Sequence, residues 1–591
     1  MMSLTKWAGT TALFLFGAAG LFAQSAPQGI PIDDPTVIRK CGGCHQRDSS
    51  GMMRRLSYMR TSPEVWEQAI KRMIRINGLT ATPAEIRDVL KYLSANNGLA
   101  PEEMKSGFWE VEHRTVGYQE DYVPAPVLQK TCNTCHNIGR VLSQRRTKDD
   151  YDKLINMHLG LFPSAMNILK PAKAKAVPVD MAAQRMITNA AGGIQFEQPR
   201  ATPAGDAKFP AESAVDWLAA NQPLITPEWT SWKAAMKTPK LVGTWLLTGE
   251  ELSKGKIFGK MTITQGAAED QFTTAVEMTY ATTGNTVKTT GRSIVYTGYN
   301  WRGRESTTPN AAPALTAAAT PTEWREAMMV SRDGNSIDGR FFWSSFGELG
   351  IDVHLSRMGS EPTALGTDIS GLQSPSKATV KIFGANLGGL KATDVDFGKG
   401  ITVSKVVSAT PTLATVEVDV AKGLAVGYRD LVLGKSTAVG AFAVYDKIGY
   451  IEVGPDAQIS RLGGLKYPKN YAQYEALAWA AGPDGKLHTD DDVALGPVQA
   501  QWTLEEFFST PDDDDTKFVG NIDDSGFFTP NVEGPNQQRK KQANNFGVNN
   551  FGDVWVAASY QAPDGTKFKA KSYLVVTVPD YTMYDQPEVA Q

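Results

Sequence analysis

All four cysteines of the 591-residue chain lie in two motifs of the same form. The motifs are Cys41-Gly42-Gly43-Cys44-His45 and Cys132-Asn133-Thr134-Cys135-His136. Two thiols separated by two residues can form thioether bonds with the two vinyl groups of one porphyrin, and the adjacent histidine can then bind the iron. We therefore predict two covalently bound haem c groups, attached through Cys41, Cys44, Cys132 and Cys135, with His45 and His136 as iron ligands.

The same cysteines could instead form two disulfides, or a zinc site built from both pairs. Disulfides would be usual in a chain that leaves the cytoplasm. However, the pairs lie about ninety residues apart and a histidine follows each of them, which favours haem attachment over both alternatives.

A low-spin electron-transfer haem needs a second axial ligand, usually methionine or histidine. For the first haem we predict Met73, on the apolar face of a helix that should begin at Ser62-Pro63-Glu64. A second helix should follow from the capping box at Thr82-Pro83-Ala84-Glu85. A methionine on an apolar face is often plain core, and four others compete for the ligand role: Met52, Met53, Met59 and Met104.

For the second haem we predict His158 as the second ligand. It lies on the face of a helix that Thr147 should cap and that also presents Tyr151, Leu154 and Ile155. Its neighbour Met157 is expected to point elsewhere, because adjacent residues on a helix diverge by about 100°. His113 is the alternative, since His354 and His488 lie in a distant part of the chain that is rich in predicted strands.

The N-terminus has the pattern of an export signal. Lys6 precedes an apolar stretch from Ala12 to Phe22, and Ala23 is a small residue suited to cleavage. The stretch is shorter than the ~20 residues that a membrane helix needs, although an uncleaved anchor is the alternative. We predict a signal peptide at residues 1–23 and a periplasmic location. A formal net charge of -3 argues against nucleic-acid binding and gives no reason to expect attraction to membranes.

Alternating strand patterns begin near Leu241. Stretches such as Lys260 to Thr264 and Phe272 to Tyr280 predict a compact antiparallel barrel of about 120 residues. A second block after Pro362 has the length of an immunoglobulin-like sandwich, and a third block of strands occupies the C-terminus.

Two other segments have distinctive compositions. The stretch from Ser164 to Pro210 is rich in Ala, Pro and Gly and predicts loops with short helices. The acidic runs Asp490 to Asp492 and Asp512 to Asp515 lack the ligand spacing of an EF-hand loop, so we expect solvated hairpin tips and no metal besides haem iron.

The mature chain resembles the alpha, or diheme, subunit of quinohemoprotein amine dehydrogenase. The resemblance rests on landmarks that occur in order through all parts of the chain. They are Lys71-Arg72-Met73, Asn77-Gly78-Leu79, Lys91-Tyr92-Leu93, Gly98-Leu99-Ala100-Pro101, Gln144-Arg145-Arg146, Asn156-Met157-His158-Leu159-Gly160, Gly298-Tyr299-Asn300-Trp301-Arg302-Gly303, Ala443-Val444-Tyr445-Asp446-Lys447, Gly534-Pro535-Asn536 and Arg539-Lys540. The longer stretch between Ser164 and Pro210 departs from the family pattern.

The resemblance implies a heterotrimer with a β-propeller subunit and a small subunit that bears a cysteine tryptophylquinone. Primary amines would be oxidised to aldehyde and ammonia at that quinone, so this chain would hold no catalytic residue. Its haems would pass the electrons to a soluble acceptor such as azurin or a cytochrome c. Met73 and His158 match the family's axial ligands.

These patterns and the resemblance together give the expected fold class. It is multidomain, with an all-α diheme cytochrome c domain followed by an antiparallel β-barrel and two immunoglobulin-like β-sandwich domains. The expected segments are the haem domain at 24–240 (lobes of about 24–110 and 111–240), the barrel at 241–361, and the sandwiches at 362–447 and 448–591.

Three other functions remain open from the sequence. A diheme cytochrome c peroxidase would need one haem with an open or displaceable distal position. The diheme subunit of another periplasmic dehydrogenase would share the motifs. A binding or adhesion protein would be consistent with the large β part, because immunoglobulin-like folds do not specify function.

Overall fold

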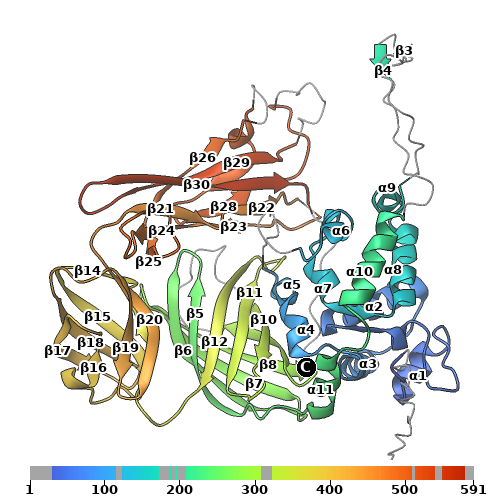
Figure 1. Cartoon of the computed structure of the whole chain (residues 1–591), viewed down its shortest axis with the longest axis horizontal. Helices are drawn as coiled ribbons and strands as arrows, with labels where there is room; N and C mark the ends of the chain where they lie inside the picture. Colours follow the sequence, from blue (N-terminus) through green and yellow to red (C-terminus); the bar gives the residue numbers. More distant parts are fainter. Residues whose placement is uncertain are drawn as a thin grey trace, which may run out of the picture.

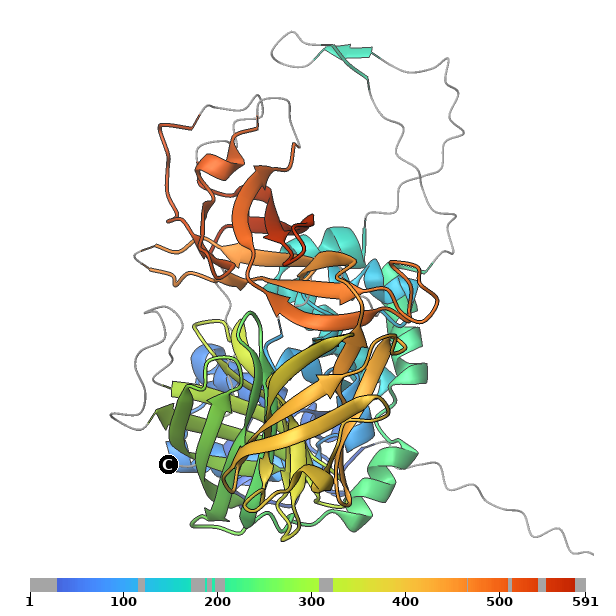
Figure 2. The same cartoon turned by 90° about the vertical axis from the view of Figure 1, so that its left-hand side faces the viewer.

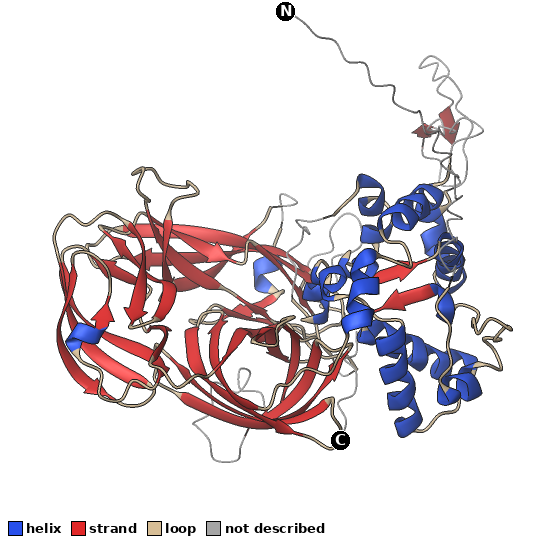
Figure 3. Cartoon of the chain, turned by 60° about the horizontal axis from the view of Figure 1, so that its bottom comes forward, coloured by secondary structure: helices blue, strands red, loops and turns tan. Residues whose placement is uncertain are grey.

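The structure of the chain is a computed structural model. It describes residues 29–114, 123–171, 186–188, 194–196, 208–307, 323–464, 466–508, 513–539 and 549–579. The expected signal peptide lies outside these residues. Helices gather at one end of the molecule and strands fill the rest (Figures 1 and 3). Among the described residues, no helix has the length and apolar character needed to cross a membrane.

The helical region begins with the segment around the first motif. Its helices are α1 (Pro35–Cys41), η1 (Leu56–Tyr58), α2 (Pro63–Asn77), α3 (Pro83–Asn96), α4 (Pro101–Lys105) and α5 (Phe108–Val111). The capping box expected at Thr82 and Glu85 is present at the start of α3. Ser62 precedes α2 as expected, but its side chain makes no capping hydrogen bond, so Pro63 alone marks this helix start.

The second motif lies among helices of similar size. They are α6 (Pro126–Gln129), η2 (Cys132–Thr134), α7 (Gly139–Leu142), α8 (Lys148–Leu161), η3 (Pro163–Ala165), α9 (Met166–Leu169), α10 (Pro210–Asn221) and α11 (Pro227–Ala235). Thr147 caps α8 through the Asp150 amide, as predicted. Within the Ser164 to Pro210 stretch the structure describes short helices and two short strands, β3 (Met186–Thr188) and β4 (Ile194–Phe196).

A two-stranded antiparallel ladder joins the two halves of the helical region. Strand β1 (Met59–Thr61) pairs with β2 (Gln144–Arg146), and Met59 lies opposite Arg146. Each half therefore contributes one strand to a shared element, which fixes their relative position.

The barrel is closed and runs up and down. Its eight antiparallel strands close in sequence order, with β12 pairing back to β5. They are β5 (Gly243–Glu251), β6 (Gly255–Gln265), β7 (Gln271–Tyr280), β8 (Thr286–Tyr296), β9 (Asn300–Thr307), β10 (Glu323–Val330), β11 (Ser336–Trp343) and β12 (Leu349–Arg357). The predicted antiparallel barrel is thus confirmed.

The barrel interior continues into the helical region. One hydrophobic cluster contains Trp245 and Trp301 of the barrel together with Leu99, Met104 and Phe108 of the helical region. Each of these side chains is at most 8% exposed. Helices α4 and α5 are therefore packed against the barrel core.

The next strands lie beside the barrel (yellow to orange in Figures 1 and 2). They form two four-stranded sheets around one apolar core, ordered β13-β15-β18-β17 and β14-β20-β19-β16. The strands are β13 (Thr363–Thr367), β14 (Gly371–Gln373), β15 (Ser376–Ala385), β16 (Val395–Asp396), β17 (Ile401–Ala409), β18 (Leu413–Val420), β19 (Gly427–Leu433) and β20 (Ser436–Tyr445).

The C-terminal strands lie above the barrel (orange to red). Three sheets surround a separate core, ordered β21-β24-β25, β22-β30-β29-β26 and β23-β28-β27. The strands are β21 (Tyr450–Gly454), β22 (Ala457–Arg461), β23 (Ala472–Gln473), β24 (Glu475–Ala480), β25 (Val493–Val498), β26 (Gln501–Glu506), β27 (Gly520–Ile522), β28 (Phe527–Pro530), β29 (Gly552–Gln561) and β30 (Lys567–Thr577).

Two carboxylates of the acidic runs are not the solvated tips that the sequence suggested, whereas Asp490 is exposed and Asp512 lies outside the described residues. Asp515 is 3% exposed and forms an ion pair with Arg539. Asp492 is also buried and accepts hydrogen bonds from the Tyr450 hydroxyl and the His488 amide. Both carboxylates thus organise loops, and that expectation was wrong for them.

Candidate haem sites

Both cysteine motifs open onto one continuous cavity. Its volume is about 2420 Å³, and its lining includes Cys41, Cys44 and His45 as well as Cys132, Cys135 and His136. Ordinary small-molecule pockets measure about 300–1,000 Å³. A cavity of this size, with a CxxCH motif at each of two places in its wall, suits two porphyrins better than one small ligand.

The end of α1 positions the first motif. The helix ends at Cys41, whose carbonyl accepts a hydrogen bond from the His45 amide at 2.8 Å. The His45 Nδ1 lies 3.0 Å from the Arg54 carbonyl oxygen. Since a carbonyl can only accept, Nδ1 must donate, and the Nε2 lone pair is left for a metal. Burial lowers the pKa of His45, and this effect outweighs the hydrogen bond to Arg54, which acts in the opposite direction. The lowered pKa favours the neutral ring.

A strained turn holds the carbonyl that orients His45. The Leu56 amide donates to the Arg54 carbonyl at 2.9 Å, so Arg55 is the middle residue of a γ-turn. Its backbone angles are φ 69° and ψ -54°, which non-glycine residues rarely adopt. Strain of this kind costs about 1–3 kcal/mol and persists only where surrounding contacts enforce it. The turn both presents the carbonyl to His45 and directs the Arg55 side chain to the cavity wall.

The second motif brings two imidazoles together. His136 Nδ1 lies 2.9 Å from the Asn137 carbonyl oxygen, and His158 Nδ1 lies 2.8 Å from that of Leu154. Both rings therefore keep Nε2 available. Their centroids are 6.4 Å apart with planes inclined at 43°. With metal–nitrogen distances of about 2.0 Å, two imidazoles on opposite sides of one metal ion have centroids about 6.3 Å apart.

The candidate methionine ligands of the first haem differ in whether they line the cavity. Met73 and Met59 line the cavity, whereas Met53 and Met104 lie in hydrophobic cores outside its lining. Met52 is also absent from the lining. Met73 lies on the last turns of α2, and its carbonyl accepts from the amide of the left-handed cap residue Gly78 (φ 74°). The structure thus reduces the rivals of Met73 to Met59 alone.

Met157 and His113, which the sequence analysis weighed against His158, also line the cavity. Met157 was expected to point away from His158, and both residues contribute to the wall of this large cavity. His113 stacks on Phe342 of the barrel with centroids 4.9 Å apart, and its Nδ1 lies 2.9 Å from the Phe346 carbonyl oxygen. Burial lowers the pKa of His113 to about 4. His113 therefore helps to join the helical region to the barrel.

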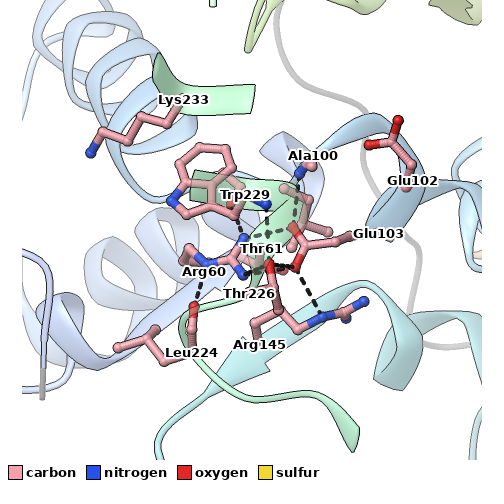
Figure 4. Close-up of polar contacts among 12 residues, drawn as sticks. Arg60, Thr61, Ala100, Glu102, Glu103, Arg145, Leu224, Thr226, Trp229 and Lys233 are labelled. Atoms are coloured by element: carbon pink, nitrogen blue, oxygen red, sulfur yellow. Dashed lines mark hydrogen bonds and ion pairs between the residues drawn. The ribbon is translucent and has the colours of Figure 1, made fainter. Parts of the chain in front are cut away.

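A buried polar cluster holds the β1–β2 ladder, and no local pattern in the sequence indicated it (Figure 4). Glu103 of α4 accepts two hydrogen bonds of 2.7 Å from Arg60 of β1 and forms an ion pair of 3.3 Å with Arg145 of β2. The Thr226 hydroxyl and the Ala100 amide also donate to this carboxylate. The Arg60 guanidinium lies over the Trp229 ring. Burial alone would raise the pKa of Glu103, but these donors lower it.

Family models match most of the chain in four consecutive segments. All four belong to the alpha subunit of quinohemoprotein amine dehydrogenase: haem binding at residues 33–174, domain II at 238–358, domain III at 364–446 and domain IV at 451–589. No curated protein matches the sequence.

Solved structures that match the chain resemble it only weakly. A de novo designed fluorescence-activating β-barrel is 19% identical, with a TM-score of 0.15, over 20% of this chain and 93% of its own. The mouse clustered protocadherin PcdhgC3 EC1-3 is 8% identical, with a TM-score of 0.14, over 41% of this chain and 75% of its own. Such low scores identify no common fold for the whole chain.

The family matches, by contrast, agree with one another in name and in order. The segment with the haem-binding match contains both CxxCH motifs and α8, which supply residues to the cavity wall. The chain belongs to the quinohemoprotein amine dehydrogenase alpha subunit family and contains the haem-binding domain of that subunit.

Proposed function

We propose that this chain is the diheme electron-transfer subunit of a periplasmic amine dehydrogenase. It takes electrons from the cysteine tryptophylquinone of a small partner subunit and passes them to a soluble acceptor such as azurin or a cytochrome c. One observation supports this most directly: both CxxCH motifs face a single cavity, so two redox groups would lie within one protein interior.

Each half of the helical region would hold one haem c. Cys41 and Cys44, and likewise Cys132 and Cys135, would form the thioether bonds. His45 with Met73, and His136 with His158, would bind the two irons. Haem c supplies a one-electron iron centre when bound. The carbonyls of Arg54, Asn137 and Leu154 hold the imidazoles with Nε2 free, and this preorientation favours ligation.

The remaining parts of the chain would serve assembly. We propose that the strands after the barrel form two immunoglobulin-like domains, at about 362–447 and 448–591, and that the partners are a β-propeller subunit and the small quinone-bearing subunit. Support comes from the two separate apolar cores in this part of the chain. Amine oxidation itself would take place in the partner, because the proposed site residues here are haem ligands.

Mass spectrometry of the acid-treated exported protein tests haem attachment. We expect the mass of two haems to remain with the chain, because thioether bonds survive treatment that removes non-covalent haem. Replacing Cys132 and Cys135 together with alanine should leave one haem, and the matched change at Cys41 and Cys44 should leave the other. A wild-type chain that loses either haem under acid would contradict covalent attachment.

Purification from the native host tests the assembly. We expect two further subunits to elute with this chain, one of them small and containing a quinone that reacts with carbonyl reagents. Added primary amine should then reduce the haems in the complex but not in the separated chain. Haem reduction by amine in the separated chain would contradict the assignment of amine oxidation to a partner.

A further inference from the structure

The wall of the cavity is strongly positive, although the whole chain has a formal net charge of -3. Ten arginine and lysine side chains line the cavity, against three glutamates. Two of these glutamates are already paired within the wall. Glu85 Oε2 lies 2.9 Å from Lys40 Nζ, and Glu110 Oε1 lies 3.2 Å from Arg140 Nε. Two more cations of the wall pair with carboxylates behind it, Lys71 with Glu67 and Arg114 with Glu112. The side chains that face the cavity are still mostly positive, which would suit anionic groups inside it.

Three of the arginines lie near one another in the cavity wall. Arg55 comes from the strained turn beside His45, Arg72 from α2, and Arg146 from β2. All three line the cavity. Since β2 pairs with β1, both halves of the helical region contribute to this arginine cluster.

Only one carboxylate of the described residues pairs with the cluster. Asp150 is 1% exposed, and its Oδ1 lies 2.9 Å from Arg55 Nε while its Oδ2 pairs with Arg146. Arg72 has no ion pair or hydrogen bond to any described side chain. Burial, and then the charges of Arg146 and Arg55, lower the pKa of Arg72, which indicates that like charges face one another. Arg146 is buried, and Arg55 and Arg72 are partly buried. Three guanidinium groups thus share one carboxylate among the described residues, which leaves room for a further anion.

The further anion should be a carboxylate within the cavity. A guanidinium matches a carboxylate through two parallel hydrogen bonds, which a lysine cannot reproduce. Haem has two propionate carboxylates, so two haems in this cavity would bring four. We propose that Arg72, together with Arg55 and Arg146, forms a binding site for haem propionates between the two halves of the helical region. This inference rests on the proposed function.

The proposed site has an electrostatic consequence. Positive charge beside a haem favours the reduced iron, because reduction adds a negative charge nearby. Removing the Arg72 charge should therefore lower the reduction potential of at least one haem. The effect should be larger than for an exposed arginine, since water and salt screen exposed charges.

Spectroelectrochemical titration of R72Q, with R75Q as the matched control, tests this proposal. Arg75 is on the same helix and also lines the cavity, but it is exposed. For R72Q we expect the ferric–ferrous equilibrium of one haem to shift about tenfold towards ferric, which is about 59 mV for one electron. R75Q should shift it much less. R72K should restore part of the potential, because it returns the charge without the planar fork.

Two controls make the outcomes distinguishable. Every variant should retain two haems by mass, and the near-infrared thioether band should remain in R72Q, which shows that Met73 ligation is intact. Equal shifts in R72Q and R75Q, or no shift in R72Q while both haems remain, would overturn the propionate site and leave the proposed function standing. A wild-type chain without attached haem would instead overturn the proposed function.

Discussion

Arg302 of the barrel and Glu64 of α2 form a buried ion pair, with 2.5 Å between Arg302 Nε and Glu64 Oε1. Neither side chain is more than 1% exposed. The Arg302 guanidinium also donates to the Trp301 carbonyl and lies over the Phe108 ring. Because Met73 lies on the same helix as Glu64, this pair fixes the helix of the predicted ligand to the barrel.

Glu64→Gln should destabilise the protein strongly. Arg302 would keep its charge but lose its partner in a buried setting, which typically costs about 3–5 kcal/mol. The free energy of unfolding, measured by denaturant titration of the haem-loaded protein, should fall by that amount.

Glu102→Gln is the matched control for this prediction. Glu102 also pairs with a barrel arginine, Arg332, at 2.8 Å, but both side chains are nearly half exposed. Pairs of this kind contribute at most about 1 kcal/mol. Similar losses in both variants would show that burial does not determine the strength of the contact between the barrel and the helical region.

His158→Ala should open a coordination position on the second haem. The spectrum of that haem should become high-spin, or change as water binds, while the first haem keeps its low-spin spectrum. Met157→Leu provides the control, because Met157 also lines the cavity but is not a predicted ligand. An unchanged spectrum in His158→Ala would show that another side chain binds this iron, and His113→Ala would then be tested.

Met73→His should remove the near-infrared thioether band and lower the potential of the first haem. Methionine raises haem potentials relative to histidine, so wild-type electrons would run from the bis-histidine haem to the histidine–methionine haem. Met59→Leu should leave the band in place. Loss of the band in Met59→Leu, together with its persistence in Met73→His, would assign the ligand to Met59.

Glu326→Gln should make barrel stability less sensitive to pH. Burial and the adjacent Glu305 raise the pKa of Glu326, and burial raises the pKa of Glu305 to about 7. These carboxyls bind protons in the folded chain but titrate near pH ~4.3 when unfolded. Their contribution is therefore fully present below about pH 4.3 and is lost as pH rises through the folded pKa values, by at most about 1.4 kcal/mol per pH unit for each proton.

Unfolding midpoints measured between about pH 5 and pH 8 would check this slope. Glu277→Gln is the control, since Glu277 lies on the same barrel but is 42% exposed and pairs with surface lysines. A slope in Glu326→Gln as steep as in the wild type would show that other groups cause the pH dependence.

Local patterns in the sequence predicted much of the fold. The helix starts at Thr82 and Thr147 depend on residues within one turn, so the sequence alone reveals them. The barrel was predictable because its strands alternate and follow one another in order. The two motifs were predictable because haem attachment needs fixed spacing within five residues.

Contacts between distant residues were not predictable in this way. Nothing near Arg60 indicates that Glu103 will accept its hydrogen bonds, and nothing near Asp515 indicates Arg539. The acidic run containing Asp515 therefore looked like a solvated turn. The arginine cluster was missed for the same reason, although the repeated pairs Arg54-Arg55 and Arg145-Arg146 were a visible hint.

The seam that closes the barrel places Arg357 of β12 opposite Trp245 of β5. The chain therefore enters and leaves the barrel at adjacent positions, as it would around an inserted module. Such a module adds little distance between the segments that flank it. Ile459 and Arg461, which follow the barrel and the next pair of sheets, can thus return to line the same cavity as Cys41. The position of the barrel against the helices therefore depends on contacts of its own, such as the buried pair of Glu64 with Arg302.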